Sequence, residues 1–159
     1  MTPEQINLIQ QNFERIAPQA EAVATAFYNR LFAMQPVLRL LFPADLGGQK
    51  QKLMTMLAMA IKSLNESEKL IPVLENMGRR HALYGVRDEY YETVGTALLQ
   101  TLREKLGGEF TAEAHAAWAE MYGFLAATMK GAAQEMARET QVVNAGSEPR
   151  GINFIAEVH

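Results

Sequence analysis

The stretch LIPVLENMGRRH, residues 70–81, decides how this chain is understood. Its apolar positions are spaced three and four apart, which is the pattern of one buried helix face. These positions are Leu70, Ile71, Leu74, Met77 and Gly78, and His81 falls next on the same face. A buried imidazole needs a polar partner, because burying a polar group without one is costly. His81 is therefore either a hydrogen-bonded core histidine or a metal ligand, since neutral imidazole is among the commonest metal ligands.

Helical periodicity continues on both sides of residues 70–81. We expect a short helical piece over 36–42, then a turn over 43–48, where proline and glycine cluster. Longer helices are expected from Pro3 to Pro18, over about 19–34, over about 49–64, from Asp88 to Gly107, and from Thr111 to about 138. The fold class predicted from this pattern is all-α, with six or seven helices joined by short connections.

Polar residues stand where several of these helices begin. Thr2 is followed three residues later by Gln5, which predicts a capping box. Asp88 and Thr111 are the expected N-caps of two later helices. The pair Gly107-Gly108 is typical of the end of a helix. These signals favour helices that begin and end within a single compact unit.

Composition excludes several classes of protein. A chain of 159 residues suggests one domain with a sizeable core. The absence of cysteine excludes disulfides, thiolate metal sites and covalent haem attachment of the Cys-x-x-Cys-His type. The net charge of −3 and the scattered basic residues argue against a nucleic-acid partner. We see neither a secretion signal nor an apolar run long enough for a membrane span, so we expect a cytoplasmic location and no membrane partner.

The chain changes character after about residue 138. Residues 144–151 are rich in glycine, proline and small polar side chains, and residues 152–159 form a short apolar segment. We therefore expect one domain over residues 1–138. Residues 139–159 are expected to form a C-terminal tail, linker-like at first and then apolar.

Several other residues are placed to share a pocket with His81. Gln49 and Leu53 are four residues apart and hence on one helix face, with Leu57 one turn further on. Tyr28 stands at the edge of an inward-facing stripe, and Phe42 closes an apolar run. Together with His81 these residues could line an apolar slot suited to a flat cofactor and a small polarisable ligand.

Each of these residues also has a structural interpretation. Tyr28 alone is compatible with an ordinary tyrosine at a helix edge, and Gln49 with a solvated residue at a helix start. Leucines at these spacings occur in the core of most helical proteins. The pair Arg79-Arg80 is either a solvated face or a partner for an acidic group on a cofactor.

The order of the motifs resembles that in a known family. The segments AFYNRLF (26–32), PVLRLLF (36–42) and GRRH (78–81) are followed by YGV (84–86), Tyr91 and VG (94–95). Over roughly residues 3–137 this arrangement is similar to the globin domain of flavohaemoglobins and to the bacterial single-domain haemoglobins related to them. The resemblance implies a globin fold enclosing a haem pocket.

The resemblance also implies a non-covalent b-type haem, with His81 as the proximal iron ligand. The other ring nitrogen of His81 would donate to a main-chain carbonyl near Met77. Tyr28 matches the distal tyrosine whose hydroxyl donates to bound dioxygen, and Phe42 matches the phenylalanine packed on the haem face. Counting back from His81 places Gln49 at the distal glutamine.

Further positions follow from the same resemblance. Leu53 matches the bulky residue over the iron, and Tyr91 matches a proximal tyrosine. The family's proximal glutamate falls on Ala133, so the proximal hydrogen-bond network is expected to be incomplete. The remaining residues expected to contact the cofactor are Leu57, Arg80, Tyr84 and Val86. The candidates for a sixth iron ligand in the resting state are Gln49, Tyr28, Lys50 and Lys52.

Three functions are compatible with this pocket. The first is reversible binding of dioxygen and nitric oxide, for oxygen transport or nitric oxide scavenging. The second is a nitric oxide dioxygenase in which Tyr28 and Gln49 are the catalytic residues. Since no G-x-G-x-x-G motif is present, such an enzyme would need an external reductase. The third is a haem-based gas or redox sensor whose residues 140–159 contact a partner. The oligomeric state is left open.

Overall fold

The computed structural model describes residues 1–143, and within that range all regular secondary structure is helical. Six α-helices lie in this range: α1 (Pro3–Ile16), α2 (Ala20–Met34), α3 (Gly47–Lys62), α4 (Ser67–Leu83), α5 (Tyr90–Leu106) and α6 (Ala112–Val143). Short 3-10 helices occupy the connections: η1 (Ala17–Gln19), η2 (Pro36–Leu41), η3 (Leu64–Glu66) and η4 (Gly107–Glu109). The predicted all-α fold is confirmed.

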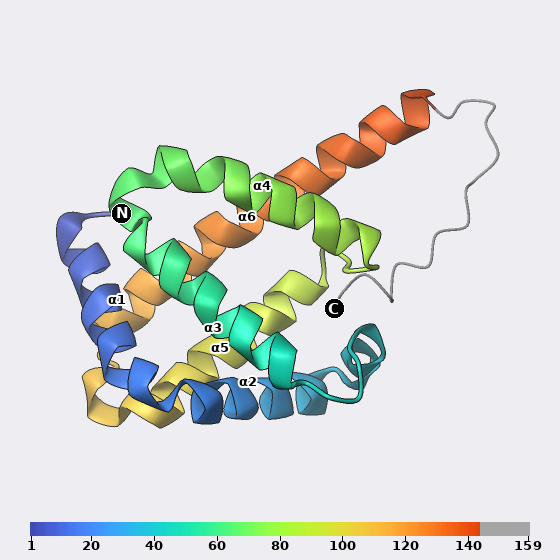
Figure 1. Ribbon diagram of the computed structural model, residues 1–159. Coiled ribbons are helices and arrows are strands. Elements are labelled where there is room, and N and C mark those ends of the chain that lie inside the picture. Colours follow the sequence, from blue (N-terminus) through green and yellow to red (C-terminus); the bar gives the residue numbers. More distant parts are fainter. Residues whose placement is uncertain (144–159) are drawn as a thin grey trace.

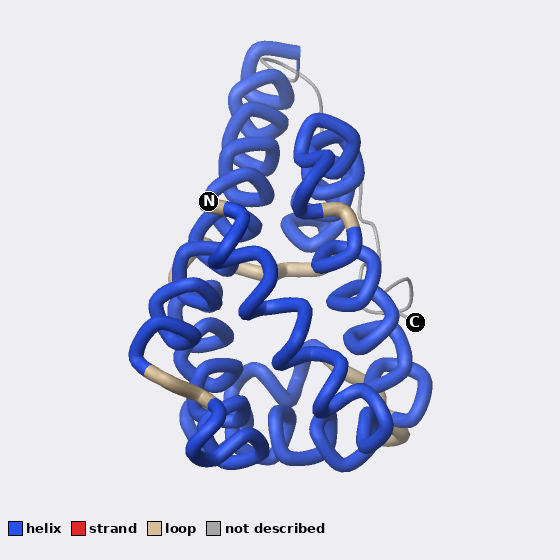
Figure 2. Tube along the Cα trace, turned by 90° about the vertical axis from the view of Figure 1, so that its left-hand side faces the viewer, coloured by secondary structure: helices blue, strands red, loops and turns tan. Residues whose placement is uncertain are grey.

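The helix α6 packs mainly against α4, α1 and α5. Figure 1 shows α4 and α6 crossing over one another, while α3 crosses in front of α5 and α2 runs along the base. The principal contacts join α4 to α6, α2 to both α5 and α3, and α1 to α6. The C-terminal end of α6 extends beyond the other helices in both views (Figures 1 and 2). In the described part of the chain, no helix combines the length and apolar character that crossing a membrane requires.

Several helix boundaries differ from those expected. The helix expected over about 49–64 is α3, which begins at Gly47, inside the turn expected over 43–48, and ends at Lys62. Asp88 is not the N-cap of α5, because Glu89 takes that position and makes no side-chain capping bond. The Asp88 carboxylate instead accepts a hydrogen bond from Gln134 Nε2 at 2.7 Å, so a tertiary contact replaces the local one. The last helix continues past residue 138 to Val143. The predicted linker and apolar segment, residues 144–159, lie outside the described residues.

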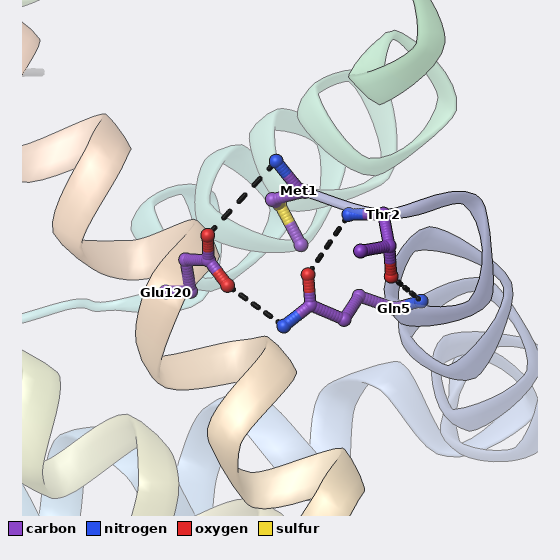
Figure 3. A network of polar contacts seen from close by, with 4 residues as sticks. All are labelled: Met1, Thr2, Gln5 and Glu120. Carbon is purple, nitrogen blue, oxygen red and sulfur yellow. Dashed lines mark hydrogen bonds and ion pairs between the residues drawn. The ribbon is translucent and has the colours of Figure 1, made fainter.

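The start of the chain is tied to α6. The predicted capping box is present, with Gln5 N donating to Thr2 Oγ1 at 3.1 Å and Thr2 N donating to Gln5 Oε1 at 2.9 Å. Gln5 Nε2 also donates to Glu120 Oε2 at 2.7 Å, and the N-terminal ammonium of Met1 lies 3.9 Å from Glu120 Oε1 (Figure 3). We call these contacts of Met1 and Gln5 with Glu120 the N-terminal clasp.

The core between α1 and α6 is anchored by a buried polar pair. The Trp118 side chain is fully buried, and its indole Nε1 donates to Asn12 Oδ1 at 3.0 Å. A buried indole N–H needs such an acceptor, because leaving it unpaired would cost roughly 1–3 kcal/mol. This bond joins α1 to α6.

A glycine allows α4 and α6 to approach closely. A Cβ atom on Gly78 would overlap the main chain of Met129 on α6. Gly78 is therefore required by packing, although glycine inside a helix costs about 1 kcal/mol relative to alanine. This contact lies one turn before His81, so it sets the distance from α6 to the helix that carries the histidine.

Candidate cofactor site

One internal cavity of about 480 Å³ lies between the helices. Its lining residues come from α2, η2, α3, α4, α5 and α6, and it has the volume of a small-molecule site. All ten residues expected to contact a cofactor line it: Tyr28, Phe42, Gln49, Leu53, Leu57, Arg80, His81, Tyr84, Val86 and Tyr91. The structure therefore brings together residues that are widely separated in the sequence.

The lining is mostly aliphatic and aromatic, and its few charges are all positive. Among the described lining residues there is no aspartate or glutamate, and the charged members are Lys52 and Arg80. These two are also the exposed members of the lining, whereas the others are buried or half-buried. The cavity therefore meets solvent where α3 and α4 each contribute a cation.

His81 is held in one tautomer by its own helix. Its Nδ1 lies 2.8 Å from the main-chain oxygen of Met77, one turn back along α4. Because a carbonyl oxygen only accepts, the proton resides on Nδ1 and the lone pair on Nε2. Burial lowers the pKa of the imidazole, with a smaller contribution in the same direction from the Arg80 charge, against an opposing effect of the Met77 bond. These effects favour the neutral imidazole, which is the form that binds metals.

Tyr28 and Gln49 form a second polar group in the same cavity. Tyr28 on α2 is 3% exposed, and burial raises the pKa of its hydroxyl to about 12. A hydrogen bond from the Gln49 side chain opposes part of this rise, which is the effect of an amide donor on the phenol oxygen. The hydroxyl is therefore protonated at neutral pH.

Aromatic packing fixes the orientation of Tyr28. Its ring lies edge-on to Phe27 and to Phe42, with centroid separations of 5.0 and 5.6 Å, and stacks with Phe32 at 5.8 Å. Arg39 stabilises the turn that carries Phe42 by donating to the main-chain oxygens of three residues, Phe42, Pro43 and Ala44. This arrangement gives the wall formed by α2 and η2 a fixed shape.

The wall formed by α5 and α6 contains three further tyrosines, Tyr90, Tyr91 and Tyr122. Tyr122 Oη donates to the main-chain oxygen of Tyr91 at 2.5 Å. A Cβ atom on Gly95 would lie 2.6 Å from the Tyr122 ring, so the ring occupies the space that this glycine leaves. Burial, with a smaller contribution from the Asp88 charge, raises the pKa of Tyr91 to about 12.

Of the two lysines considered as iron ligands, Lys52 lines the cavity and Lys50 does not. Met56 was not among the predicted contacts, although it shares a helix face with Gln49 and Leu53. The helical spacing of Tyr122 indicates a buried face, but its contact with Tyr91 joins residues 31 positions apart, which no local pattern encodes.

Taken together, these features define an all-α protein with an apolar internal pocket that presents one histidine. A model of the Globin family matches residues 25–129 of the chain. The chain therefore belongs to the globin family.

Relatives support this assignment. The chain is 35% identical over 129 residues to a flavohemoprotein of Bordetella parapertussis, an alignment that covers 79% of this chain and 32% of that protein. It is 31% identical over 139 residues to a flavohemoprotein of Rhizobium meliloti, covering 86% of this chain and 34% of that one. The chain thus spans about a third of the length of the curated relatives it matches.

A solved structure shares the fold. A bacterial globin from Campylobacter jejuni superposes with a TM-score of 0.77, covering 86% of this chain and 99% of the other at 24% sequence identity. Membership of the globin family implies a haem cofactor and the binding of a gaseous ligand to it.

The residues present fit such a cofactor. Haem is a flat apolar ring with two carboxylates at one edge. The cavity offers apolar walls and two cations at its opening. It also offers a neutral imidazole whose Nε2 carries no proton and can bind a metal. Because no acidic side chain is present in the described lining, the carboxylates would meet no like charge there.

Proposed function

We propose that the chain binds haem b non-covalently in this cavity and binds dioxygen and nitric oxide reversibly. The observation that carries the proposal is the state of His81, which lines an apolar pocket. Its Nδ1–H donates to the main-chain oxygen of Met77, which leaves Nε2 unprotonated and able to bind a metal. When bound, the haem iron supplies the coordination position for a diatomic gas.

The proposed role of Tyr28 is to donate a hydrogen bond to the gaseous ligand. A hydrogen-bond donor at this position would stabilise a polarised diatomic ligand more than an apolar wall would. Tyr28 is protonated at neutral pH, so its hydroxyl can donate, and the Gln49 side chain lies within hydrogen-bonding range of it. This arrangement predicts slow oxygen release.

The proposed role of Arg80 and Lys52 is to bind the carboxylates of the cofactor. Both are exposed and line the opening of the cavity. Phe42 would pack against a face of the ring, and the remaining predicted contacts, Leu53, Leu57, Tyr84, Val86 and Tyr91, would enclose it. We further propose that the globin domain occupies residues 1–138 and that the protein acts in the cytoplasm.

A second candidate function is nitric oxide dioxygenase activity supported by an external reductase. Two observations favour it: the Tyr28–Gln49 pair would retain dioxygen as a reactant, and the curated relatives are flavohemoproteins of which this chain spans about a third.

The visible absorption spectrum of the purified protein tests the first proposal. We expect a Soret band that shifts on reduction with dithionite and again on exposure to oxygen, and no such band in a His81→Ala variant loaded in the same way. A wild-type protein that gains no Soret band after haemin addition would overturn the proposal. Nitrate formed in many turnovers with an added flavin reductase would favour the dioxygenase, and a single turnover would favour the binding protein.

A further inference from the structure

The segment that follows His81 is held by side chains from α6. Tyr122 Oη donates to the main-chain oxygen of Tyr91, and Gln134 Nε2 donates to Asp88 Oδ2 at 2.7 Å. Lys130 Nζ lies 5.9 Å from the centroid of the Tyr91 ring, within range of a cation–π contact. We call Tyr122, Lys130 and Gln134 the α6 clamp.

The three clamp residues lie eight and four positions apart, so they occupy one face of α6. They contact residues 88–91, where α5 begins. The start of α5 makes no side-chain capping bond of its own, because Glu89 at the N-cap position provides none. The clamp therefore supplies tertiary contacts at a helix start that lacks a local cap.

The same helix also fixes the other side of His81. Gly78, three residues before His81, packs its backbone against the main chain of Met129 on α6. Met129 lies between Tyr122 and Lys130 in the sequence. The segment 78–91 is thus attached to α6 at both of its ends, and His81 lies between the two attachments.

Gly95 shows that the fit at the clamp is close. Its missing side chain makes room for the Tyr122 ring, and any Cβ atom there would come within 2.6 Å of it. Within the segment itself, Tyr84, Val86 and Tyr91 line the cavity together with His81. A shift at residues 88–91 would therefore be transmitted along the cavity wall toward the histidine.

We infer that the α6 clamp is a positioning device for His81: by fixing residues 88–91 it sets how the imidazole is presented to the cavity. This inference rests on the proposed function, since it concerns the bond that His81 makes to haem iron. Tyr122, Lys130 and Gln134 act through the segment 84–91, so they are positioning residues rather than ligands.

The decisive variant is Tyr122→Phe, which removes one hydroxyl and leaves the ring on Gly95. The matched control is Glu120→Ala, which removes the N-terminal clasp two residues earlier on the same helix (Figure 3). Both variants lose a tertiary polar contact of α6, but the contact in the clamp is the one that lies beside the cavity.

The reporting measurement is the iron–histidine stretching frequency in the resonance Raman spectrum of the reduced, ligand-free holoprotein. We expect Tyr122→Phe to shift or broaden this band and to speed haem loss to an apomyoglobin acceptor severalfold. Glu120→Ala is expected to lower the melting temperature and leave both quantities at their wild-type values. A purely structural role for Tyr122 would lower the melting temperature alone, and that outcome overturns the inference.

A second variant keeps the inference testable if the first does not bind haem. If Tyr122→Phe cannot be loaded with haem, Gln134→Ala removes a single exposed bond of the clamp and takes its place. An unchanged stretching band in Gln134→Ala would then overturn the inference. Failure of the proposed function is distinct, because the wild-type protein itself would show no iron–histidine band.

Discussion

The two polar walls of the cavity are built in different ways. On the wall that carries Tyr28, the polar groups bond to each other, and aromatic rings hold them in place. On the wall that carries His81, both the imidazole and the Tyr122 hydroxyl donate hydrogen bonds to main-chain oxygens. The first wall therefore keeps a donor available for a ligand, while the second uses its donors to fix the backbone. This difference indicates that ligand chemistry and histidine placement are separable by mutation.

The largest expected effect comes from removing the imidazole. We expect His81→Ala to abolish stable haem binding, because no other described histidine lines the cavity. His115→Ala is the matched control, since His115 lies on α6 beside Phe110, outside the cavity. Retention of a wild-type Soret band in His81→Ala would show that another residue binds the iron.

The close packing of α4 on α6 gives the next effect. A Cβ atom on Gly78 would overlap the main chain of Met129, so Gly78→Ala must force the helices apart and is expected to cost about 3 kcal/mol of unfolding free energy. The control is Gly123→Ala on α6, where a Cβ atom meets nothing within 4 Å. That change is expected to be neutral or to stabilise by about 0.5–1 kcal/mol. Urea unfolding of the two variants measures the contrast, and equal midpoints would contradict it.

The sequence predicted the Tyr28 wall and the position of His81 better than it predicted the contacts that fix the His81 segment. Tyr28, Phe42, Gln49 and His81 each stand on a helical stripe or at the end of an apolar run, and such local patterns determine which face of a helix is buried. Asp88 was misassigned as an N-cap because a short polar side chain before a helix is the usual signal for one. Its actual partner, Gln134, lies 46 residues away, and no local pattern encodes such a contact.

Removing the Tyr28 hydroxyl tests the ligand-binding wall alone. We expect Tyr28→Phe to bind haem normally and to release oxygen about 10- to 100-fold faster, the loss that corresponds to one hydrogen bond to a charged acceptor. Stopped-flow oxygen dissociation measures the rate. Phe27→Leu is a control for altered aromatic packing, because Phe27 lies edge-on to Tyr28 and carries no donor. An unchanged rate in Tyr28→Phe would remove this residue from the proposed site.

The smallest expected effect is on the pH dependence of stability, to which one tyrosine on each wall contributes. Burial raises the pKa of both Tyr28 and Tyr91 to about 12, above the ordinary value of about 10 for tyrosine. A folded-state pKa above the unfolded value means that the folded protein binds more protons between those values. The stability contributed by these tyrosines is therefore complete below about pH 10 and is lost as the pH rises toward 12.

The neighbours of the two tyrosines act in opposite directions. Gln49 lowers the pKa of Tyr28, so Gln49→Leu should raise it, whereas Asp88 raises the pKa of Tyr91, so Asp88→Asn should lower it. Spectrophotometric titration of tyrosinate absorbance in the folded protein measures both shifts. We expect the stability lost between neutral and alkaline pH to be smaller in Asp88→Asn than in Gln49→Leu, because the first change brings a folded-state pKa closer to the unfolded value and the second takes one further from it. No shift in either variant would mean that burial alone controls both tyrosines, and shifts of the same sign would contradict the opposite effects of the two neighbours.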